Sequence, residues 1–220
     1  MKTTLHKECL PKNGWKVFRA IKGIIIKYQG VLAGGTALSL QIGHRLSVDL
    51  DFFTNKDFST DSLISAIRKT GLNFRVLSEG EGFLIADIDG VKFSLFQYDY
   101  PFVTPIAYKD VLIASIFDIA AMKMIAIIQR GTKRDFADLY FILQTTPFYK
   151  IANHTVKRFG KERVNPIHIG KALVYFSDAD SNPDPVYIER KIKWETIKKF
   201  FKQYAKQFVL DMDIALKASK

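Results

Sequence analysis

The segment VLAGGTALSLQIGHRLSVDLDFFT, Val31 to Thr54, predicts a strand, a tight turn, a helix and a second strand in that order. The apolar run 31–33 is typical of a short buried strand. Gly34 and Gly35 follow, and they let the chain turn sharply where a side chain would clash. A phosphate group could approach the backbone at this turn, although a glycine pair before a helix also suits an ordinary strand-to-helix connection.

The helix after this turn is expected to run over Ala37–Ile42, with Thr36 as its N-cap and Gly43 at its end. Its free N–H groups and the positive end of its dipole would point at an anion. The glycine pair and Thr36 together are therefore our predicted phosphate-binding turn.

Two carboxylates lie in the second strand of the segment. Side chains two residues apart in a strand share one face, so Asp49 and Asp51 would point together while Val48, Leu50 and Phe52 face the core. Paired carboxylates repel each other unless a cation lies between them, and hard oxygen ligands suit Mg²⁺ that carries nucleotide phosphates. The alternative is two solvated aspartates on an edge strand, but the aromatic residues that follow make this a poor surface strand.

Composition limits the class of protein. A chain of 220 residues with 48% hydrophobic residues can bury a substantial core as one large domain or two small ones. No apolar run is long enough to span a bilayer, since Asp118 and Lys123 interrupt the longest, Ala114–Ile128. The N-terminus lacks the apolar stretch of a secretion signal. Cys9 is the only cysteine, which excludes an internal disulfide and fits a reducing cytoplasm. The net charge of +11 favours a polyanionic partner.

The pattern of the remaining chain indicates two parts. The first is an α/β part with a mixed sheet, over residues 1–105, and the second is a helical part over residues 106–220. Asp89-Gly90 is a strong hairpin turn signal between two strands. The expected helices are Pro11–Tyr28, a helix from Asp61 to about Gly71, Val111–Arg130, Arg134–Leu143 and an amphipathic helix from Trp194 to Phe208; the expected strands are 73–77, 83–88 and 91–98. Ser177–Pro185 has the composition of an exposed loop and possible hinge.

A second group of candidate residues lies in FDIAAMKMIAIIQRGTKRDFADLY. Lys123 stands in a helix that is apolar nearly all round, and a buried ammonium needs an anionic partner or a route to solvent. Arg130 shares its face two turns later, so the two cations could hold a triphosphate. Lys123 could instead extend to water or pair with an aspartate.

Thr132 is expected to cap the next helix, with Asp135 three residues on as the acid of a capping box. Asp138 follows one turn later on the same side. Asp135 could have this structural role alone, or it could orient Lys123 or Arg130.

The stretches GGTALSL and GHRLSVDLDFF, followed by AAMKMIAIIQRGTKRDFADLYFIL, resemble the nucleotidyltransferase toxins of the AbiEii/AbiGii family, from abortive-infection, type IV toxin–antitoxin systems. The resemblance covers Val31 to Leu143 and extends more loosely to the C-terminal helix. It implies the DNA polymerase β-type nucleotidyltransferase fold, with a mixed-sheet α/β (α+β) core followed by a helical C-terminal part. It also implies an RNA acceptor such as tRNA and a cognate antitoxin as a partner.

The resemblance implies a role for each candidate residue. Gly35 and Thr36 would hold nucleotide phosphates, and Asp49 and Asp51 would bind Mg²⁺ or Mn²⁺. Lys123 would contact the nucleotide. Asp135 or Asp138, the two aspartates of the RDFADL segment, would complete the site.

One position departs from the pattern. The fold often places a third carboxylate on a strand beside the aspartate pair, and in VKFSLFQY this position falls on Ser94. Asp87, Asp89 and Asp99 are the nearby substitutes that the sequence offers. The predicted activity is transfer of a nucleotidyl group from an NTP to an acceptor hydroxyl, on RNA or on a protein. The alternatives are a nucleotide- or RNA-binding module without activity, and a protein whose basic surface docks an acidic antitoxin or regulator.

Overall fold

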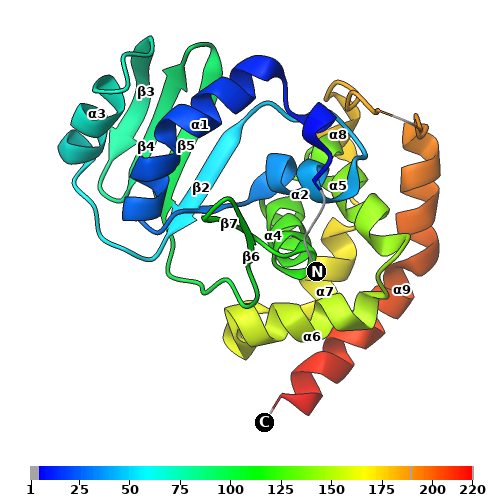
Figure 1. Ribbon diagram of the computed structural model, residues 1–220. Coiled ribbons are helices and arrows are strands. Elements are labelled where there is room, and N and C mark those ends of the chain that lie inside the picture. Colours follow the sequence, from blue (N-terminus) through cyan, green and yellow to red (C-terminus); the bar gives the residue numbers. More distant parts are fainter. Residues whose placement is uncertain (1–4, 189, 220) are drawn as a thin grey trace. The chain divides into compact units, whose positions relative to one another are not determined.

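The computed structural model of the protein describes residues 5–188 and 190–219. The chain divides into two compact units, residues 1–115 and 116–220 (Figure 1). The boundary therefore falls ten residues later than the expected division at residue 105. The reason is a hairpin that extends the sheet of the first unit, and this hairpin was not expected from the sequence.

Unit 1 contains a mixed sheet with the strand order β3-β4-β5-β2-β1-β7-β6. The mixed sheet followed by a helical part confirms the predicted fold class. Strand β1 is antiparallel to β2 and parallel to β7, and β2 is parallel to β5. The strands are β1 (Val31–Leu32), β2 (Leu50–Thr54), β3 (Phe74–Gly80), β4 (Phe83–Ile88), β5 (Val91–Gln97), β6 (Ile106–Tyr108) and β7 (Val111–Ile113).

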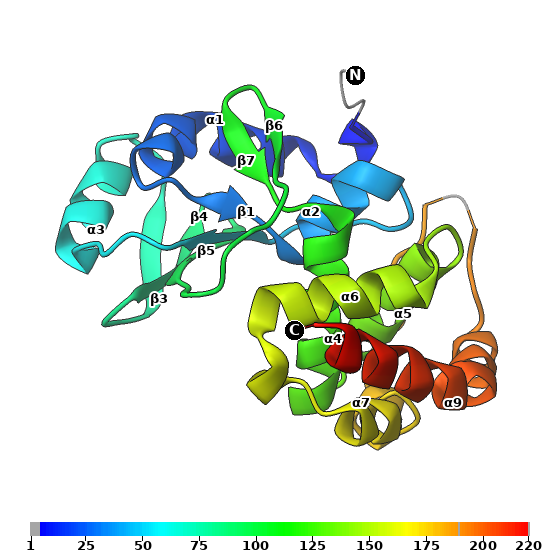
Figure 2. The ribbon, with the colours of Figure 1, turned by 90° about the horizontal axis from the view of Figure 1, so that it is seen from below.

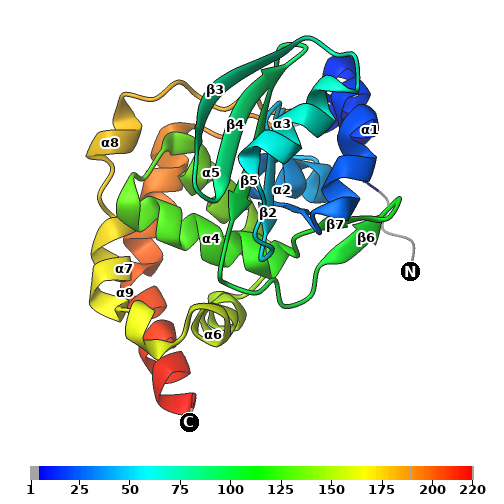
Figure 3. The ribbon, with the colours of Figure 1, turned by 90° about the vertical axis from the view of Figure 1, so that its left-hand side faces the viewer.

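Helices α1 (Lys12–Lys27) and α3 (Thr60–Arg68) cover one face of this sheet (Figure 3). The core forms where the apolar stripe of α1 meets the buried side chains of the strands, and Phe18 stacks on Phe52 with 6.5 Å between ring centroids. Phe52 in turn contacts Phe93 of β5. The chain also forms α2 (Gly34–Ile42) and a short 3-10 helix, η1 (Lys7–Cys9).

The opposite face of the sheet is only half buried. Burial alternates along β4 and β2, so that Asp51 and Phe53 lie on this face while Leu50 and Phe52 lie in the core. The predicted alternation thus holds for Asp51. It is wrong for Val48, which precedes the strand and is 50% exposed, because β2 begins only at Leu50.

The helix expected at Val111–Arg130 is a strand followed by a shorter helix. Val111–Ile113 pairs with β6 and β1, and α4 begins only at Ile116. The turn before β7 contains Lys109 and Asp110, both with positive φ, instead of glycine. The structure therefore forms a hairpin at a turn whose only usual turn residue is Asp110.

Unit 2 is helical. Its helices are α4 (Ile116–Gln129), α5 (Lys133–Leu143), α6 (Phe148–Phe159), α7 (Pro166–Ala172), α8 (Ser177–Asp180) and α9 (Trp194–Ala218), with a 3-10 helix, η2 (Lys161–Arg163). The long helix α9 packs along α6 and α7 (Figure 2). Its apolar side chains bury Phe136 in an aromatic cluster that includes Phe176, Trp194 and Phe201, as the amphipathic pattern predicts.

The segment 177–185 is not the free loop that its composition predicts. It begins with α8, and Asp180 accepts a hydrogen bond from the indole of Trp194 at 2.6 Å. Asn182 and Asp184 accept hydrogen bonds from the backbone and side chain of Lys133, both at 3.1 Å. These polar residues therefore tie the starts of α5 and α9 together.

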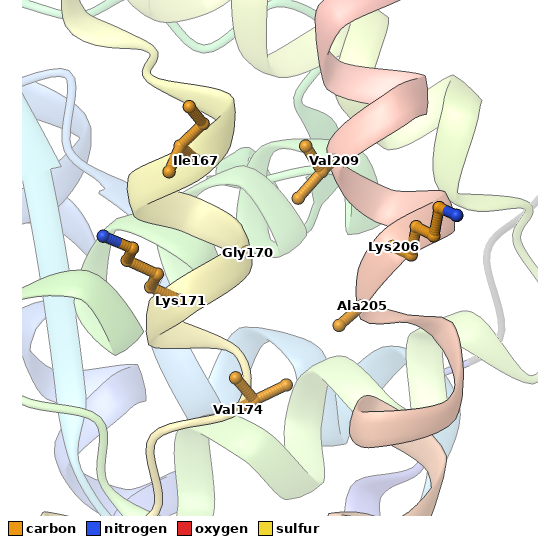
Figure 4. Close-up of a pocket in the computed structure, with 7 residues that line it drawn as sticks. All are labelled: Ile167, Gly170, Lys171, Val174, Ala205, Lys206 and Val209. Atoms are coloured by element: carbon orange, nitrogen blue, oxygen red, sulfur yellow. The ribbon is translucent and has the colours of Figure 1, made fainter.

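A shallow groove of about 260 Å³ lies between α7 and α9. Ile167 and Val174 line one side and Val209 the other, with Lys171 and Lys206 on the two outer flanks (Figure 4). None of the predicted site residues lines it. Within the described part of the chain, no helix has the length and apolar character needed to cross a membrane.

Candidate active site

The pairing of β1 with β2 sets the geometry of the site in unit 1. Leu32 stands opposite Phe52, and the backbone N–H of Ala33 donates to the carbonyl of Asp51 at 2.9 Å. This register brings the start of α2 beside the Asp51 carboxylate. A Cβ at Gly34 would lie 3.4 Å from Asp51 Oδ2, and Gly34 has φ +68, a conformation that glycine adopts without strain.

Helix α2 begins three residues earlier than expected. Its N-cap is Ala33, in an extended conformation and without a side-chain cap, and Gly34 is its first residue. Thr36 is therefore not the N-cap, because it lies inside the first turn. Its hydroxyl instead bonds to Ser47 Oγ at 2.9 Å and to the carbonyl of Asp49. Thr36 thus fastens the helix start to the segment before β2.

Two residues of this region were missed from the sequence. Arg45 is buried, and its Nη2 atom lies only 2.2 Å from the place where a Cβ of Gly35 would stand. Ser47 Oγ lies 3.2 Å from the same point. Gly35 is therefore required by close packing of the Arg45 side chain. The only sequence signal for this contact is the basic residue four positions before Asp49.

Asp49 and Asp51 have different local structure. Asp51 is in β2, whereas Asp49 is half buried in the segment before the strand and its carbonyl accepts the Thr36 hydroxyl. Strand alternation therefore does not place the Asp49 side chain, and the joint role of the two carboxylates stays a prediction. No group of three or more His, Cys, Asp or Glu side chains suited to a metal occurs among the described residues.

Ser94 lies at the position beside Asp51 that the family resemblance implies for a third carboxylate. It is the direct cross-strand partner of Asp51, and its hydroxyl donates to Asp51 Oδ1 at 2.9 Å. Asp87 pairs with Lys92 at another level of the sheet, and Asp89 is in the hairpin turn bonded to Lys16 and Asn73. Neither residue takes the place beside Asp51, so this position holds a hydroxyl instead of a third carboxylate.

The donor set fits a magnesium ion of the type that acts with nucleotides. Mg²⁺ commonly takes one or two protein carboxylates and completes its six oxygen ligands with water and substrate phosphates. Asp51 supplies one carboxylate at the half-buried face, beside a glycine that leaves the approach free of a side chain. Asp49 is the second candidate ligand, and the Ser94 hydroxyl orients the Asp51 carboxylate.

The candidate residues of unit 2 form one buried ion cluster. Lys123 Nζ lies 2.7 Å from Asp135 Oδ1 and 2.7 Å from Asp138 Oδ2. All three residues are buried, and both aspartates lie on one side of α5, as predicted from their spacing. Lys123 therefore pairs with aspartates, which was one of the possibilities considered from the sequence. Arg130 is more distant, with Nη2 at 3.8 Å from Asp135 Oδ2 and a side chain that is 67% exposed.

Asp135 also caps helix α5. Thr132 and Asp135 form the predicted capping box, and the Thr132 hydroxyl donates to Asp135 Oδ2 at 2.6 Å. Burial opposes ionisation of Asp135, but the charge and hydrogen bond of Lys123 and the hydrogen bond of Thr132 outweigh it. The pKa of this carboxyl consequently lies below its ordinary value.

A second buried network in unit 2 was not expected. Asp118 on α4 is fully buried, and its Oδ1 lies 2.8 Å from His154 Nε2 and 3.3 Å from Arg158 Nη1 on α6. Arg158 also donates to the Asp118 carbonyl at 2.8 Å. The sequence signal for this network was Asp118, a charged residue inside an apolar helix. Its partners His154 and Arg158 lie 36 and 40 residues away in the sequence, so spacing did not indicate them.

Solved structures share the fold. A candidate nucleotidyltransferase from Helicobacter pylori has a TM-score of 0.60 at 19% identity, over 91% of this chain and 95% of that one. MenT4, a nucleotidyltransferase toxin from Mycobacterium tuberculosis, has a TM-score of 0.52 at 14% identity over 94% of each chain. The fold is that of a nucleotidyltransferase, as the sequence predicts.

The family follows from the sequence match. The model of the "Nucleotidyl transferase AbiEii toxin, Type IV TA system" family matches residues 26–108 and 100–215. An uncharacterised protein of Aquifex aeolicus, aq_aa25, is 40% identical over 184 residues, which are 81% of this chain and 87% of that protein. The chain belongs to the AbiEii nucleotidyltransferase toxin family, which confirms the resemblance noted from the motifs.

Proposed function

We propose that this nucleotidyltransferase moves a nucleotidyl group from an NTP to a hydroxyl of an RNA acceptor, in a Mg²⁺-dependent reaction, and that it acts as a toxin. The observation that supports this proposal most strongly is the Asp51 carboxylate beside the first residue of α2, with Ser94 hydrogen-bonded to it. The carboxylate can bind a divalent cation, and the helix N-terminus beside it can bind the phosphates that the cation accompanies.

In this proposal the backbone N–H groups at Gly34, Gly35 and Thr36 bind the phosphates of the NTP. Asp51, together with Asp49, holds the divalent ion, which when bound neutralises charge on the α-phosphate and on the leaving pyrophosphate. The acceptor hydroxyl attacks the α-phosphorus, the bond to pyrophosphate breaks, and the hydroxyl proton leaves to solvent or to a carboxylate. Catalysis consists mainly of placement and charge stabilisation.

The residues of unit 2 have a separate role in the proposal. As the resemblance implies, Lys123 and Arg130 would contact the nucleotide, and Asp135 and Asp138 would orient Lys123. The 2.7 Å contacts that hold the Lys123 ammonium support an orienting role for both aspartates. We expect Arg130→Ala to raise the KM for the NTP without affecting folding, because its side chain is largely exposed.

RNA is the proposed acceptor because the net charge of +11 favours a polyanionic partner. A tRNA-like 3′ end offers the required hydroxyl on a polyanion. An antitoxin protein is the proposed partner, in accordance with the type IV system to which the family belongs.

A second candidate function is supported by one observation. Ser94 stands at the position where a third carboxylate would complete the metal site. A site with fewer carboxylates binds Mg²⁺ more weakly, and the chain could then bind nucleotide or RNA without transfer.

The test is incubation of the purified chain with Mg²⁺, each α-labelled NTP and total RNA. We expect label on RNA, loss of that label in Asp51→Asn, and no label when the divalent ion is chelated. Label on protein would contradict the RNA acceptor. Binding of NTP without any transfer would favour the second candidate function over the first.

A further inference from the structure

We infer that the half-buried face of the unit 1 sheet is a stacking platform for unpaired bases of a single-stranded RNA acceptor, and this inference rests on the proposed function. The platform is an aromatic row formed by Phe53 of β2, Phe96 of β5 and Phe83 of β4. It lies on the same sheet face as the Asp51 carboxylate.

Strand register places the three rings in a row. Phe53 is the direct partner of Phe96 in the parallel pair β2–β5, and Phe96 is the direct partner of Phe83 in the antiparallel pair β4–β5. Directly paired residues lie on one face of a sheet. The rings of Phe53 and Phe96 are 5.5 Å apart between centroids, at an interplanar angle of 30°. The row therefore crosses three adjacent strands.

The row is adjacent to the proposed metal ligand. Phe53 follows Asp51 by two residues in β2, and Phe96 follows Ser94 by two residues in β5. Each aromatic residue therefore lies one side-chain position along its strand from the Asp51–Ser94 pair on the same face. A nucleotide whose hydroxyl approaches Asp51 could place a neighbouring base on the row.

A charged row, in which two cations flank one carboxylate, lies on the other side of the Asp51–Ser94 pair. Arg75 of β3 is paired with Asp87 of β4, which is paired with Lys92 of β5, and both cations are exposed. The face thus presents, in successive rows, two exposed cations on either side of Asp87, a carboxylate with a hydroxyl, and aromatic rings. Phosphates, a reacting hydroxyl and bases are the chemical groups that these rows suit.

The length of the aromatic row favours RNA over the single base of an NTP. Adjacent strands are about 4.8 Å apart, so a row across three strands is about 10 Å long. This exceeds the ring of one base and accommodates two. Sheets with aromatic side chains on one face are a known way of binding unpaired RNA bases.

The rings also have a packing role, which the experiment must separate from stacking. Tyr98 and Phe102 lie against Phe53, with centroid distances of 5.2 and 6.3 Å. Phe83 is at the opposite end of the row, where its ring covers Gly80, whose missing Cβ would lie 2.5 Å from Phe83 Cε1. Phe83 and Phe96 are each half buried, so part of each ring is accessible.

The test is fluorescence anisotropy of a labelled single-stranded oligoribonucleotide titrated with the full chain, in Mg²⁺ and without NTP. Phe83→Leu and Phe96→Leu keep an apolar side chain but remove the stacking face, and each is expected to weaken binding about ten-fold. Phe58→Leu is the matched control, because Phe58 is a half-buried aromatic residue of the same unit whose ring contacts Tyr28 at the end of α1. It should leave binding unchanged.

Phe83→Trp restores an aromatic face and guards against a folding defect in the leucine variants. It should bind RNA as the natural chain does, and its added fluorescence should be quenched by single-stranded RNA and much less by a duplex. If both leucine variants bind RNA as tightly as Phe58→Leu, or if the natural chain does not bind RNA, the platform is excluded. A raised KM for the NTP with unchanged RNA binding would assign the rings to the NTP base and overturn the inference.

The two proposals fail in different ways. Absence of nucleotidyl transfer with ring-dependent RNA binding would remove the proposed activity and leave the platform. Transfer to RNA with no effect of the phenylalanine substitutions would leave the activity and remove the platform.

Discussion

Gly34 combines a positive φ with a position next to the Asp51 carboxylate. Its φ of +68 is unfavourable for any residue with a Cβ, and the Cβ would contact Asp51 Oδ2 at 3.4 Å. Gly71 has the first property without the second, since its φ is +73 and no atom lies within 4 Å of its Cβ position. A comparison of alanine substitutions at Gly34 and Gly71 therefore distinguishes the effect of backbone strain from the effect of contact with the Asp51 carboxylate.

We expect Gly34→Ala to lower the free energy of unfolding by about 1 kcal/mol because of its positive φ, and to reduce nucleotidyl transfer because an apolar methyl group then stands in contact with the Asp51 carboxylate. Gly71→Ala should have a similar cost in stability with normal activity. Urea unfolding and the labelled-NTP assay measure the two effects. Equal activity in both variants would show that the contact between Gly34 and Asp51 has no role in catalysis.

The hydroxyl at Ser94 leads to a prediction about metal affinity. Ser94→Asp would place a third carboxylate directly beside Asp51 and should lower the Mg²⁺ concentration needed for half-maximal transfer several-fold. Without Mg²⁺ the same variant should be less stable, because the adjacent carboxylates repel each other.

Ser78→Asp is the matched control. Ser78 of β3 lies opposite Ile85 of β4, and Ile85 in turn lies opposite Ser94 of β5. It puts the same charge on the same row, two strands away. If Ser94→Asp and Ser78→Asp give the same Mg²⁺ dependence as the natural chain, Ser94 does not stand at a metal-ligand position.

The lowered pKa of Asp135 predicts a pH dependence of stability. A carboxyl whose pKa is lower in the folded chain adds stability above its ordinary pKa of about 3.9, and this stability is lost as the pH falls through the folded value. We expect the free energy of unfolding to fall less steeply below about pH 4 in Asp135→Asn than in the natural chain. Urea titrations at successive pH values measure this slope, with Asp61→Asn, in the exposed first turn of α3, as the control.

At the scale of elements, the Lys123 cluster joins α4 to α5 through charge. A buried ion pair contributes little net stability, but removal of one partner leaves the other charges buried without compensation. Lys123 faces two carboxylates, so it is the member whose loss costs most.

We therefore expect Lys123→Met to lower the free energy of unfolding by about 3 kcal/mol. Adding Asp135→Asn and Asp138→Asn to that variant should restore part of the loss, because the isolated negative charges are then removed. Lys217→Met is the control, since Lys217 makes only an exposed pair with Asp213 and should cost less than about 0.5 kcal/mol. A loss in Lys123→Met no larger than in the control would contradict the role of the cluster.

Elements with a clear period or a strong turn signal could be predicted. The apolar stripe of α1 gave Pro11–Tyr28 against the observed Lys12–Lys27, and Asp89-Gly90 marked its hairpin, where both residues have positive φ. Strand β7 could not be separated from α4, because Val111–Ile113 runs into another apolar segment and a continuous apolar run has no period that distinguishes strand from helix.

The sequence indicated which residues belong to the candidate site more readily than how their side chains contact one another. Helix spacing placed Asp135 and Asp138 on one side of a helix, and the family resemblance placed Ser94 beside the aspartate pair, where the β2–β5 register has it. The prediction of Thr36 as N-cap was wrong and Arg45 was missed, because the Thr36 hydroxyl bonds and the Arg45 packing depend on how the irregular segment 43–49 folds back on α2. Such contacts have no local pattern in the sequence.

At the scale of the whole molecule, each unit has its own core. Residues 1–115 contain the complete sheet, and its final strand β7 pairs with β1 while Val111 and Ile113 are buried. Removal of β6 and β7 would expose β1 as an edge and open the core beside it.

We expect a fragment of residues 1–115 to fold alone with a cooperative thermal transition, and a fragment of residues 1–105 to aggregate or melt at a lower temperature. Circular dichroism and light scattering measure both properties. Equal behaviour of the two fragments would show that the hairpin is not part of the folding unit.

The antiparallel register of β1 and β2 determines whether the Asp51 carboxylate lies on the open face of the sheet. A slip of one residue would turn Asp51 into the hydrophobic layer and send Phe52 outward, so no intermediate alignment keeps a usable carboxylate. We therefore expect damage to this strand pair to reduce the fraction of active molecules rather than the turnover of each active one, which active-site titration would measure.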